Sequence, residues 1–263
     1  MKDLIIKKFI YGGNPVDGPS WGMTTIFHGS MRYRHNEINE NRISFLDELC
    51  SEKNNGGVKK AAAGLELIHS KKIYDIENSL EVQNMQGDGI ITRNKKLIPV
   101  VTVADCVPIF IYDLNSGTFG ALHSGWKGTG IVGEAIAIIE KKYGSSPKDI
   151  CVAIGPHIGD CCYNIDKERA GYFCDNFGTE CVRKIDGDNW ALSLTKANLA
   201  VLDRAGIPHE NIVVHDPCTC CHRENGEFKF GSFRRQTLGL PSDMPLEEKM
   251  LKFTVQAAFV KWN

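Results

Sequence analysis

Thiol and imidazole side chains at the ends of predicted strands are the first residues of this chain that suggest a chemistry. Cys106 and His123 each follow an apolar, strand-like run, where a rigid strand passes into a loop. Zinc prefers thiolate and imidazole ligands, and a catalytic zinc site has three protein ligands and one open position. His69 is one of several possible third ligands, because eight histidines are present and a lone histidine is commonly a hydrogen-bonded structural residue.

A glycine-rich loop directly follows the second of these strands. Residues 123–130 read HSGWKGTG and lead into a predicted helix, whose unpaired backbone N–H groups and dipole favour an anion. The loop matches neither the P-loop nor the dinucleotide-binding fingerprint, and a tight turn without a ligand fits its shape equally well. If a phosphate binds there, Lys127 is the charged contact and Trp126 offers a face for stacking a ring.

The densest group of the ten cysteines is residues 218–222, CTCCH, which by composition looks more like a metal site than Cys106 does. Its spacing argues against a second metal, because adjacent Cys220 and Cys221 tend to point apart and do not readily share one tetrahedral ion. Buried small hydrophobic residues or redox-sensitive thiols are the plainer interpretation. The same interpretation applies more strongly to Cys161 and Cys162.

The elements that must position these residues are strands and helices mixed along the chain. Apolar spacing predicts a surface helix over 39–50, a turn-rich segment over 51–57, and then a β-like region that contains His69. Runs of strand length follow, with Pro108 at a break between two of them; further helices begin near residues 131 and 195. The expected strands are 98–103, 108–113, 118–123 and 150–155, and the expected helices are 131–144 and 195–207. The class is therefore α/β or α+β, and the absence of repeats or linkers predicts a single domain, 1–263.

Composition excludes several kinds of partner. The chain has 31 Lys and Arg against 32 Asp and Glu, a net charge of −1, so it lacks the basic excess with which proteins bind nucleic acid. The longest apolar run, 97–112, is shorter than the ~20 residues of a membrane helix, and the N-terminus lacks the features of a signal peptide. We therefore expect a cytoplasmic protein with reduced cysteines, acting on a small molecule and binding neither nucleic acid nor membrane.

Together these motifs resemble those of the laccase-domain (YfiH-like) family. The resemblance extends from about Asn41 and Arg42 to the C-terminus and rests on ELIHS, GDGIIT, VTVADCVPIFIYD, GALHSGWKGTG, IGPHIGDCCYNID, and CT ahead of FGSFRR. The family was first described as polyphenol oxidoreductases and later as zinc-dependent purine nucleoside phosphorylases with adenosine deaminase activity. Its fold, similar to that of cytotoxic necrotising factor toxins, implies an α-β-β-α arrangement of layers with mixed sheets.

The resemblance also implies roles for individual residues. The family's metal ligands fall here on His69, Cys106 and His123, which would hold Zn²⁺, or Cu²⁺ as the alternative. Cys106, His123 and Asp105 are the expected catalytic residues, with Asp88 as a second possible proton carrier, although either aspartate could simply cap a turn. The expected contacts with the nucleoside and phosphate are Lys127, Arg234 and Arg42, with Arg235 as a further basic candidate. A homodimer is possible.

Some positions depart from the family's pattern. Glu66 stands where the family usually has Gln, which would add a negative charge near the metal. Ser124 replaces Ala, Gly231 interrupts the usual FFS, and TLGL replaces TGR, so an arginine that could hold an anion is missing.

Two other activities remain open on the same residues. His69, Cys106 and His123 formally offer the His₂Cys ligands of a copper site, which would make the protein a phenol oxidase. The sequence has no H-x-H pair from which a multicopper centre could be built. A cell-wall precursor amidase would instead use Cys106 as nucleophile with a histidine as base, a role in conflict with ligating zinc. A binding module without catalysis is the third alternative.

Overall fold

The computed structural model describes residues 3–51 and 59–262 of the 263-residue chain, so the turn-rich segment predicted over 51–57 falls, apart from Ser51, outside the described residues. The helices are α1 (Glu40–Ser51), α2 (Ile131–Tyr143), α3 (Lys167–Phe177), α4 (Leu194–Arg204), α5 (Phe233–Gln236) and α6 (Leu246–Met250). The strands are β1 (Ile5–Tyr11), β2 (Asn14–Met23), β3 (Ala61–Gly64), β4 (Ile73–Ile76), β5 (Gly89–Thr92), β6 (Leu97–Val103), β7 (Val107–Asp113), β8 (Phe119–Ser124), β9 (Ile150–Ile154), β10 (Asn164–Ile165), β11 (Val182–Asp186), β12 (Asn189–Leu192), β13 (Ile212–Val214), β14 (Arg223–Glu224), β15 (Glu227–Phe228) and β16 (Gln256–Trp262).

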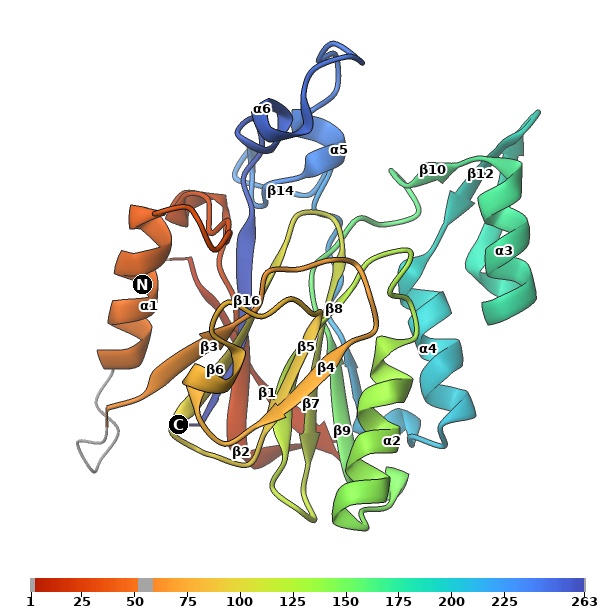
Figure 1. Cartoon of the computed structure of the whole chain (residues 1–263). Coiled ribbons are helices and arrows are strands. Elements are labelled where there is room, and N and C mark those ends of the chain that lie inside the picture. The colour runs from red at the N-terminus through yellow and green to blue at the C-terminus, as the bar shows by residue number, and fades with distance from the viewer. Residues whose placement is uncertain (1–2, 52–58, 263) are drawn as a thin grey trace.

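Two mixed sheets pack face to face, with helices on both outer faces (Figure 1). One sheet has the order β1-β2-β16-β6-β3 and the other β13-β9-β7-β8-β5-β4. Helix α1 covers the outer face of the five-stranded sheet, and α2 and α4 cover that of the six-stranded sheet. The predicted α-β-β-α layering is therefore confirmed.

The alternation of side chains along β7 shows why the layers form. Every residue of this strand is buried; Ile109 and Ile111 face the helices, while Phe110 and Tyr112 face the other sheet. Successive side chains of a strand point to opposite faces, so a strand that is apolar at every position must lie between two apolar layers. Between the sheets Phe110 stacks on Trp21 of β2, with ring centroids 4.9 Å apart.

The sequence predicted most of the elements around the site. The helices expected over 39–50, 131–144 and 195–207 are α1, α2 and α4, and the expected central strands are β6 to β9. The expected break beside Pro108 lies at residues 104–106, between β6 and β7, and Pro108 is the second residue of β7. Its carbonyl accepts the N–H of Gly155, one residue beyond the end of β9. Proline is tolerated here because the paired residues of β7 and β9 end at Ile109 and Ile154, just before Pro108 would need an N–H of its own.

Two smaller parts project from the sheets at the end where the site lies. The sheet β10-β12-β11 carries α3 on one side of this end, and the segment with α5 and α6 rises beside it (Figure 1). Within the described residues, no helix has the length and apolar character needed to cross a membrane.

Candidate metal centre

His69, Cys106 and His123 come together from three separate connections. His69 lies in the loop between β3 and β4, Cys106 in the turn between β6 and β7, and His123 near the end of β8. Their ligand atoms all lie within 4.8 Å of one another, and the two imidazole rings meet edge to face at 4.9 Å. His123 is buried, Cys106 is half-buried and His69 is exposed, so the group opens to the surface on the His69 side.

The β-like region expected around His69 is wrong in that segment. His69 has a φ of +58°, a left-handed conformation that no strand residue adopts, and β3 ends at Gly64. The apolar Leu65 and Leu67 that suggested a strand pack instead with the core beneath the loop. Backbone strain of this kind persists where surrounding contacts fix it.

Asp88 supplies those contacts. Its carboxylate accepts the backbone N–H of His69 at 2.9 Å, both the backbone N–H and hydroxyl of Ser70, and a bond from His123 Nδ1 at 2.8 Å. Burial raises the pKa of Asp88, but the hydrogen bonds and charge of His123 and the bonds from Ser70 outweigh it and hold this pKa below its usual value. The anionic Asp88 thereby fixes the ring of His123 with Nε2 left for a metal.

The thiol and imidazole are electrostatically matched. Burial raises the pKa of Cys106, but the positive charge and hydrogen bonds of His123 and His69 have the larger effect. The net pKa falls to about 6, so the thiolate is favoured. Burial lowers the pKa of His123, but the Cys106 thiolate and Asp88 have the larger effect and raise it to about 9. A thiolate is the form of cysteine that binds a metal.

This donor set fits zinc. One thiolate and two imidazoles give three ligands of the types that zinc takes in catalytic sites, and the exposed side leaves room for a fourth. The Asp88–His123 bond is the carboxylate–histidine contact that commonly supports such a ligand. The same His₂Cys set also suits copper, so the donor types alone admit both ions.

Gly125 closes the centre from the loop side. A side chain at this position would place its Cβ 2.9 Å from the His69 ring and 3.2 Å from the Cys106 sulfur. Only glycine lets the loop pass this close to both ligands.

Asp105, expected to move protons, is held as a structural clamp. Its buried carboxylate accepts bonds from the hydroxyls of Thr219 at 2.6 Å and Ser232 at 3.0 Å, and from the backbone N–H of Arg234 at 2.6 Å. Asp105 itself has a φ of +83°. Through these three bonds the Asp105 carboxylate joins the Cys106 turn to the C-terminal segment. The bonds favour a positioning role for Asp105 over proton transfer.

Two of the backbone N–H groups where the glycine-rich loop enters α2 already have partners. The N–H groups of Ile131 and Gly133, in the first turn of α2, already donate to the carbonyls of Gly128 and Gly130. Lys127 is exposed beside the ring of Trp126, its Nζ 5.4 Å from the ring centroid. Phosphate contact by Lys127 stays a prediction.

The two C-terminal arginines differ in how they are used. The guanidinium of Arg235 donates to the carbonyls of Thr219, Cys220 and Phe230, which makes it an internal brace. That of Arg234 donates only to the carbonyl of Asn164, at 3.2 Å, among the contacts described, and lies over the ring of Tyr163. Arg234 is therefore the arginine available to a ligand.

Arg42 and Glu66 have contacts that the sequence did not suggest. The guanidinium of Arg42 is buried over the ring of Tyr33, 4.3 Å away, and burial lowers its pKa to about 10. Its guanidinium also lies beside Gly64 of β3, and its part in substrate binding stays a prediction. Glu66 pairs with Arg34 at 2.9 Å and accepts the N–H of His35, so its charge is balanced by an arginine.

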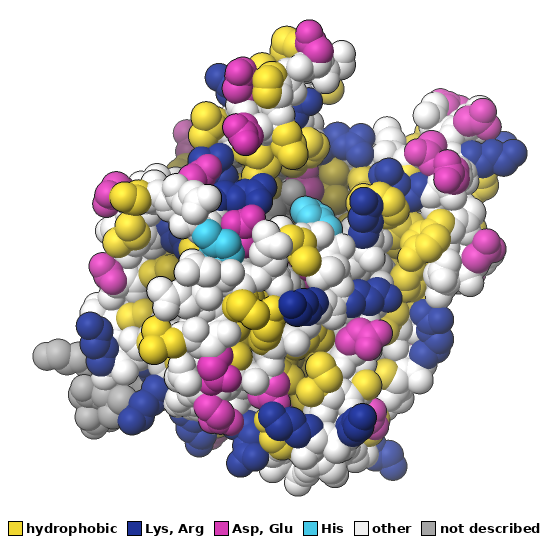
Figure 2. All heavy atoms as spheres, in the orientation of Figure 1, with side chains coloured by type: hydrophobic (Ala, Val, Ile, Leu, Met, Phe, Trp, Pro, Cys, Tyr) yellow, Lys and Arg dark blue, Asp and Glu magenta, His cyan; other side chains and the backbone are white. Residues whose placement is uncertain are grey.

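Sequence reasoning named Trp126 but missed Tyr163, a second aromatic residue beside the centre. Arg169 of α3 stacks on Trp126 at 4.3 Å, and Tyr163 lies close enough to Cys106 for the thiolate, together with burial, to raise the pKa of the phenol. Figure 2 shows two histidine side chains on this face, with Lys and Arg side chains gathered between them and the projections above. The tyrosine that follows two cysteines was the available signal.

Gly231, one of the departures, is required by packing. A Cβ there would lie 2.1 Å from the backbone oxygen of Thr254, so the two segments can approach only at a glycine.

The protein is thus a layered α-β-β-α fold with a His₂Cys group, where its loops meet, that could hold a metal ion. The profile of the family described as multi-copper polyphenol oxidoreductase laccase matches residues 31–240, and the chain belongs to this family. The chain also superposes on the crystal structure of YlmD from Geobacillus stearothermophilus with a TM-score of 0.76, at 25% identity, covering 93% of this chain and 92% of the other.

Relatives of this chain carry the names of nucleoside enzymes. It is 31% identical over 206 residues to purine nucleoside phosphorylase CA_C1699 of Clostridium acetobutylicum, covering 74% of this chain and 83% of the other. It is 37% identical over 144 residues to purine nucleoside phosphorylase LACC1 of Mus musculus, covering 52% of this chain but only 33% of that protein. Adenosine deaminase RL5 of an unknown prokaryotic organism is 33% identical over 159 residues, with 59% and 58% covered.

Proposed function

We propose that this chain is a purine nucleoside phosphorylase that works with zinc at His69, Cys106 and His123 and also deaminates adenosine. The observation that carries the proposal is the Asp88-supported His₂Cys centre, open on one side and bordered by aromatic and basic side chains. The names of the relatives support the same chemistry. Inosine, adenosine and methylthioadenosine are the nucleosides to test.

In phosphorolysis, an oxygen of inorganic phosphate attacks C1′ of the ribose and the bond from C1′ to the purine nitrogen breaks. The bonding electrons leave with the purine, which takes up a proton, and the products are the free base and ribose 1-phosphate. Such a reaction needs an oriented anion and a bound purine, since positioning supplies much of the rate. Zinc held by the three ligands would supply a Lewis acid beside the nucleoside.

The chain's own residues divide this work. Arg234, whose guanidinium makes one described hydrogen bond, and the exposed Lys127 would hold phosphate. Trp126 and Tyr163 present aromatic faces, and Arg169 braces the first of them. Asp88 keeps the His123 ring oriented throughout.

The test is release of base from inosine by zinc-loaded protein, with and without phosphate. We expect base release to require phosphate and to yield ribose 1-phosphate in equal amount. Base release at the same rate without phosphate, or none in its presence, would overturn the phosphorylase proposal. Adenosine incubated without phosphate should give inosine and ammonia if the deaminase activity is also present.

Copper and amidase chemistry give different results in the same preparation. A phenol oxidase would oxidise phenols after copper loading and lose that activity after chelation and zinc loading. An amidase that uses Cys106 as nucleophile would cleave cell-wall peptides without any metal and be blocked by a thiol reagent.

A further inference from the structure

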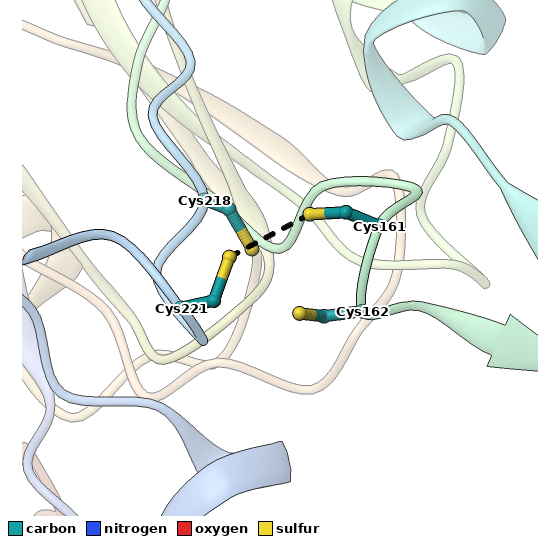
Figure 3. A group of neighbouring side chains, drawn as sticks. All are labelled: Cys161, Cys162, Cys218 and Cys221. Carbon is teal, nitrogen blue, oxygen red and sulfur yellow. Dashed lines mark hydrogen bonds between the residues drawn. The ribbon is translucent and has the colours of Figure 1, made fainter.

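Four cysteines from two distant segments converge near the metal centre just described. Cys161 and Cys162 follow β9, Cys218 and Cys221 follow β13, and their sulfur atoms all lie within 4.8 Å of one another. Figure 3 shows the four side chains pointing toward a common point between the two turns. All four thiols are free in the structure.

The spacing of these sulfurs suits a tetrahedral ion. A zinc–sulfur bond of about 2.3 Å in a tetrahedron places the sulfurs about 3.8 Å apart. The sulfurs of Cys161 and Cys221 are 3.7 Å apart, well beyond the ~2.05 Å of a disulfide. The group therefore has the dimensions of a Cys₄ metal site.

The backbone around the group holds it in that arrangement. Cys218 and Cys221 form a C-x₂-C turn, closed by the bond from the His222 N–H to the Cys218 carbonyl, and the N–H of Gly159 donates to the Cys218 sulfur at 3.2 Å. The N–H groups of Cys162 and Tyr163 both donate to the carbonyl of Gly159, which makes a turn tight enough for both neighbouring thiols to face inward.

Two further features are compatible with a metal ion bound by the four thiolates. A Cβ at Gly159 would lie 3.3 Å from the Cys161 sulfur, so glycine keeps this side of the group clear. The guanidinium of Arg235, bound to the carbonyls of Thr219 and Cys220, lies where it can balance the charge of a tetrathiolate.

We propose that Cys161, Cys162, Cys218 and Cys221 bind a structural zinc ion, separate from the centre at His69, Cys106 and His123. The C-x₂-C pair was present in the sequence, but adjacent Cys220 and Cys221 argued against it. Cys221 joins the group without Cys220, and the other two ligands come from the earlier turn. The bound ion would lock the turn that carries Thr219, whose hydroxyl holds Asp105 beside Cys106.

Zinc content of the full chain, purified under reducing conditions without added metal, tests this proposal. We expect two zinc ions per chain in the wild type, one in Cys218→Ser or Cys106→Ala, and none in the double variant. Cys174→Ser, which removes a half-buried thiol outside the group, is the control and should keep two. A Cys218→Ser protein with the zinc content of the wild type would overturn the proposal, whatever the occupancy of the other centre.

A second measurement on the wild type covers failure of Cys218→Ser to fold. The four thiols should resist alkylation by iodoacetamide until zinc is removed with a chelator and then react, as read by mass spectrometry of the peptides; Cys174 should react equally in both states. Equal reactivity of the four thiols before and after chelation would overturn the proposal, as would a Cys161–Cys221 disulfide in the reduced preparation.

Discussion

At the scale of single residues, the account depends on groups that hold the ligands in place. Asp88 bonds to His123, to the backbone of His69 and to Ser70, so one buried carboxylate orients two of the three ligands. Removal of such a supporting group typically weakens metal binding by about 10- to 100-fold. The first prediction concerns this residue.

Asp88→Asn should weaken zinc binding at the His69–Cys106–His123 centre by about 10- to 100-fold, because the neutral amide is a weaker acceptor for His123 Nδ1. Competition with a chelator of known affinity measures this, in a Cys218→Ser background that leaves one centre. Asp17→Asn, at an exposed carboxylate, is the control and should change nothing. Unchanged affinity in Asp88→Asn would contradict the role given to this residue.

Gly125→Ala should disrupt the same centre by contact alone. The added methyl group would press on the His69 ring and the Cys106 sulfur, so we expect zinc affinity and phosphorolysis to fall together. Gly171→Ala, in α3 with nothing near its Cβ, is the matched control and should leave both unchanged while keeping or slightly raising the melting temperature. Wild-type zinc affinity in Gly125→Ala would contradict the close approach of this loop to His69 and Cys106.

Arg234→Ala should raise the KM for phosphate by roughly 10- to 100-fold, the effect of one lost charge-assisted hydrogen bond. The readout is phosphate saturation at fixed inosine, with Arg183→Ala on the exposed face of β11 as control. A KM that does not change would remove Arg234 from the phosphate site.

At the scale of elements, the clamp on Asp105 joins the β6–β7 turn to the start of α5. Ser232 both caps α5, through the N–H of Arg235, and donates to Asp105 from a fully buried position. Ser193 caps α4 but has no such second bond among those described. Comparing alanine variants of the two serines therefore separates the loss of a helix cap from the loss of the bond to Asp105.

Ser193→Ala should lower the free energy of unfolding by about 1 kcal/mol, the usual cost of a lost cap. Ser232→Ala should cost more, about 2 to 4 kcal/mol, because it also leaves the buried Asp105 carboxylate with one donor fewer. Denaturant unfolding of the two variants measures the difference. Equal losses would show that the bond to Asp105 contributes little.

At the scale of the whole molecule, the residue pattern predicted individual strands and helices better than it predicted the loops, while the layering was implied by the resemblance to the family. The uninterrupted apolar strand that became β7 and the helix spacing of α2 depend on local periodicity, which the fold preserved. The loop of His69 could not be predicted in this way, because its φ of +58° depends on Asp88, 19 residues away in sequence. The cysteine group was missed for the same reason, since Cys161 and Cys218 meet only through the packing of β9 against β13.

The central claim is that phosphorolysis takes place at the His69–Cys106–His123 centre. The most direct measurement is ribose 1-phosphate formation from inosine and phosphate by wild type, Cys106→Ser and Cys174→Ser, with zinc content determined on the same samples. We predict that Cys106→Ser loses one zinc ion and the activity together, while Cys174→Ser keeps both. Undiminished phosphorolysis by Cys106→Ser would contradict the account.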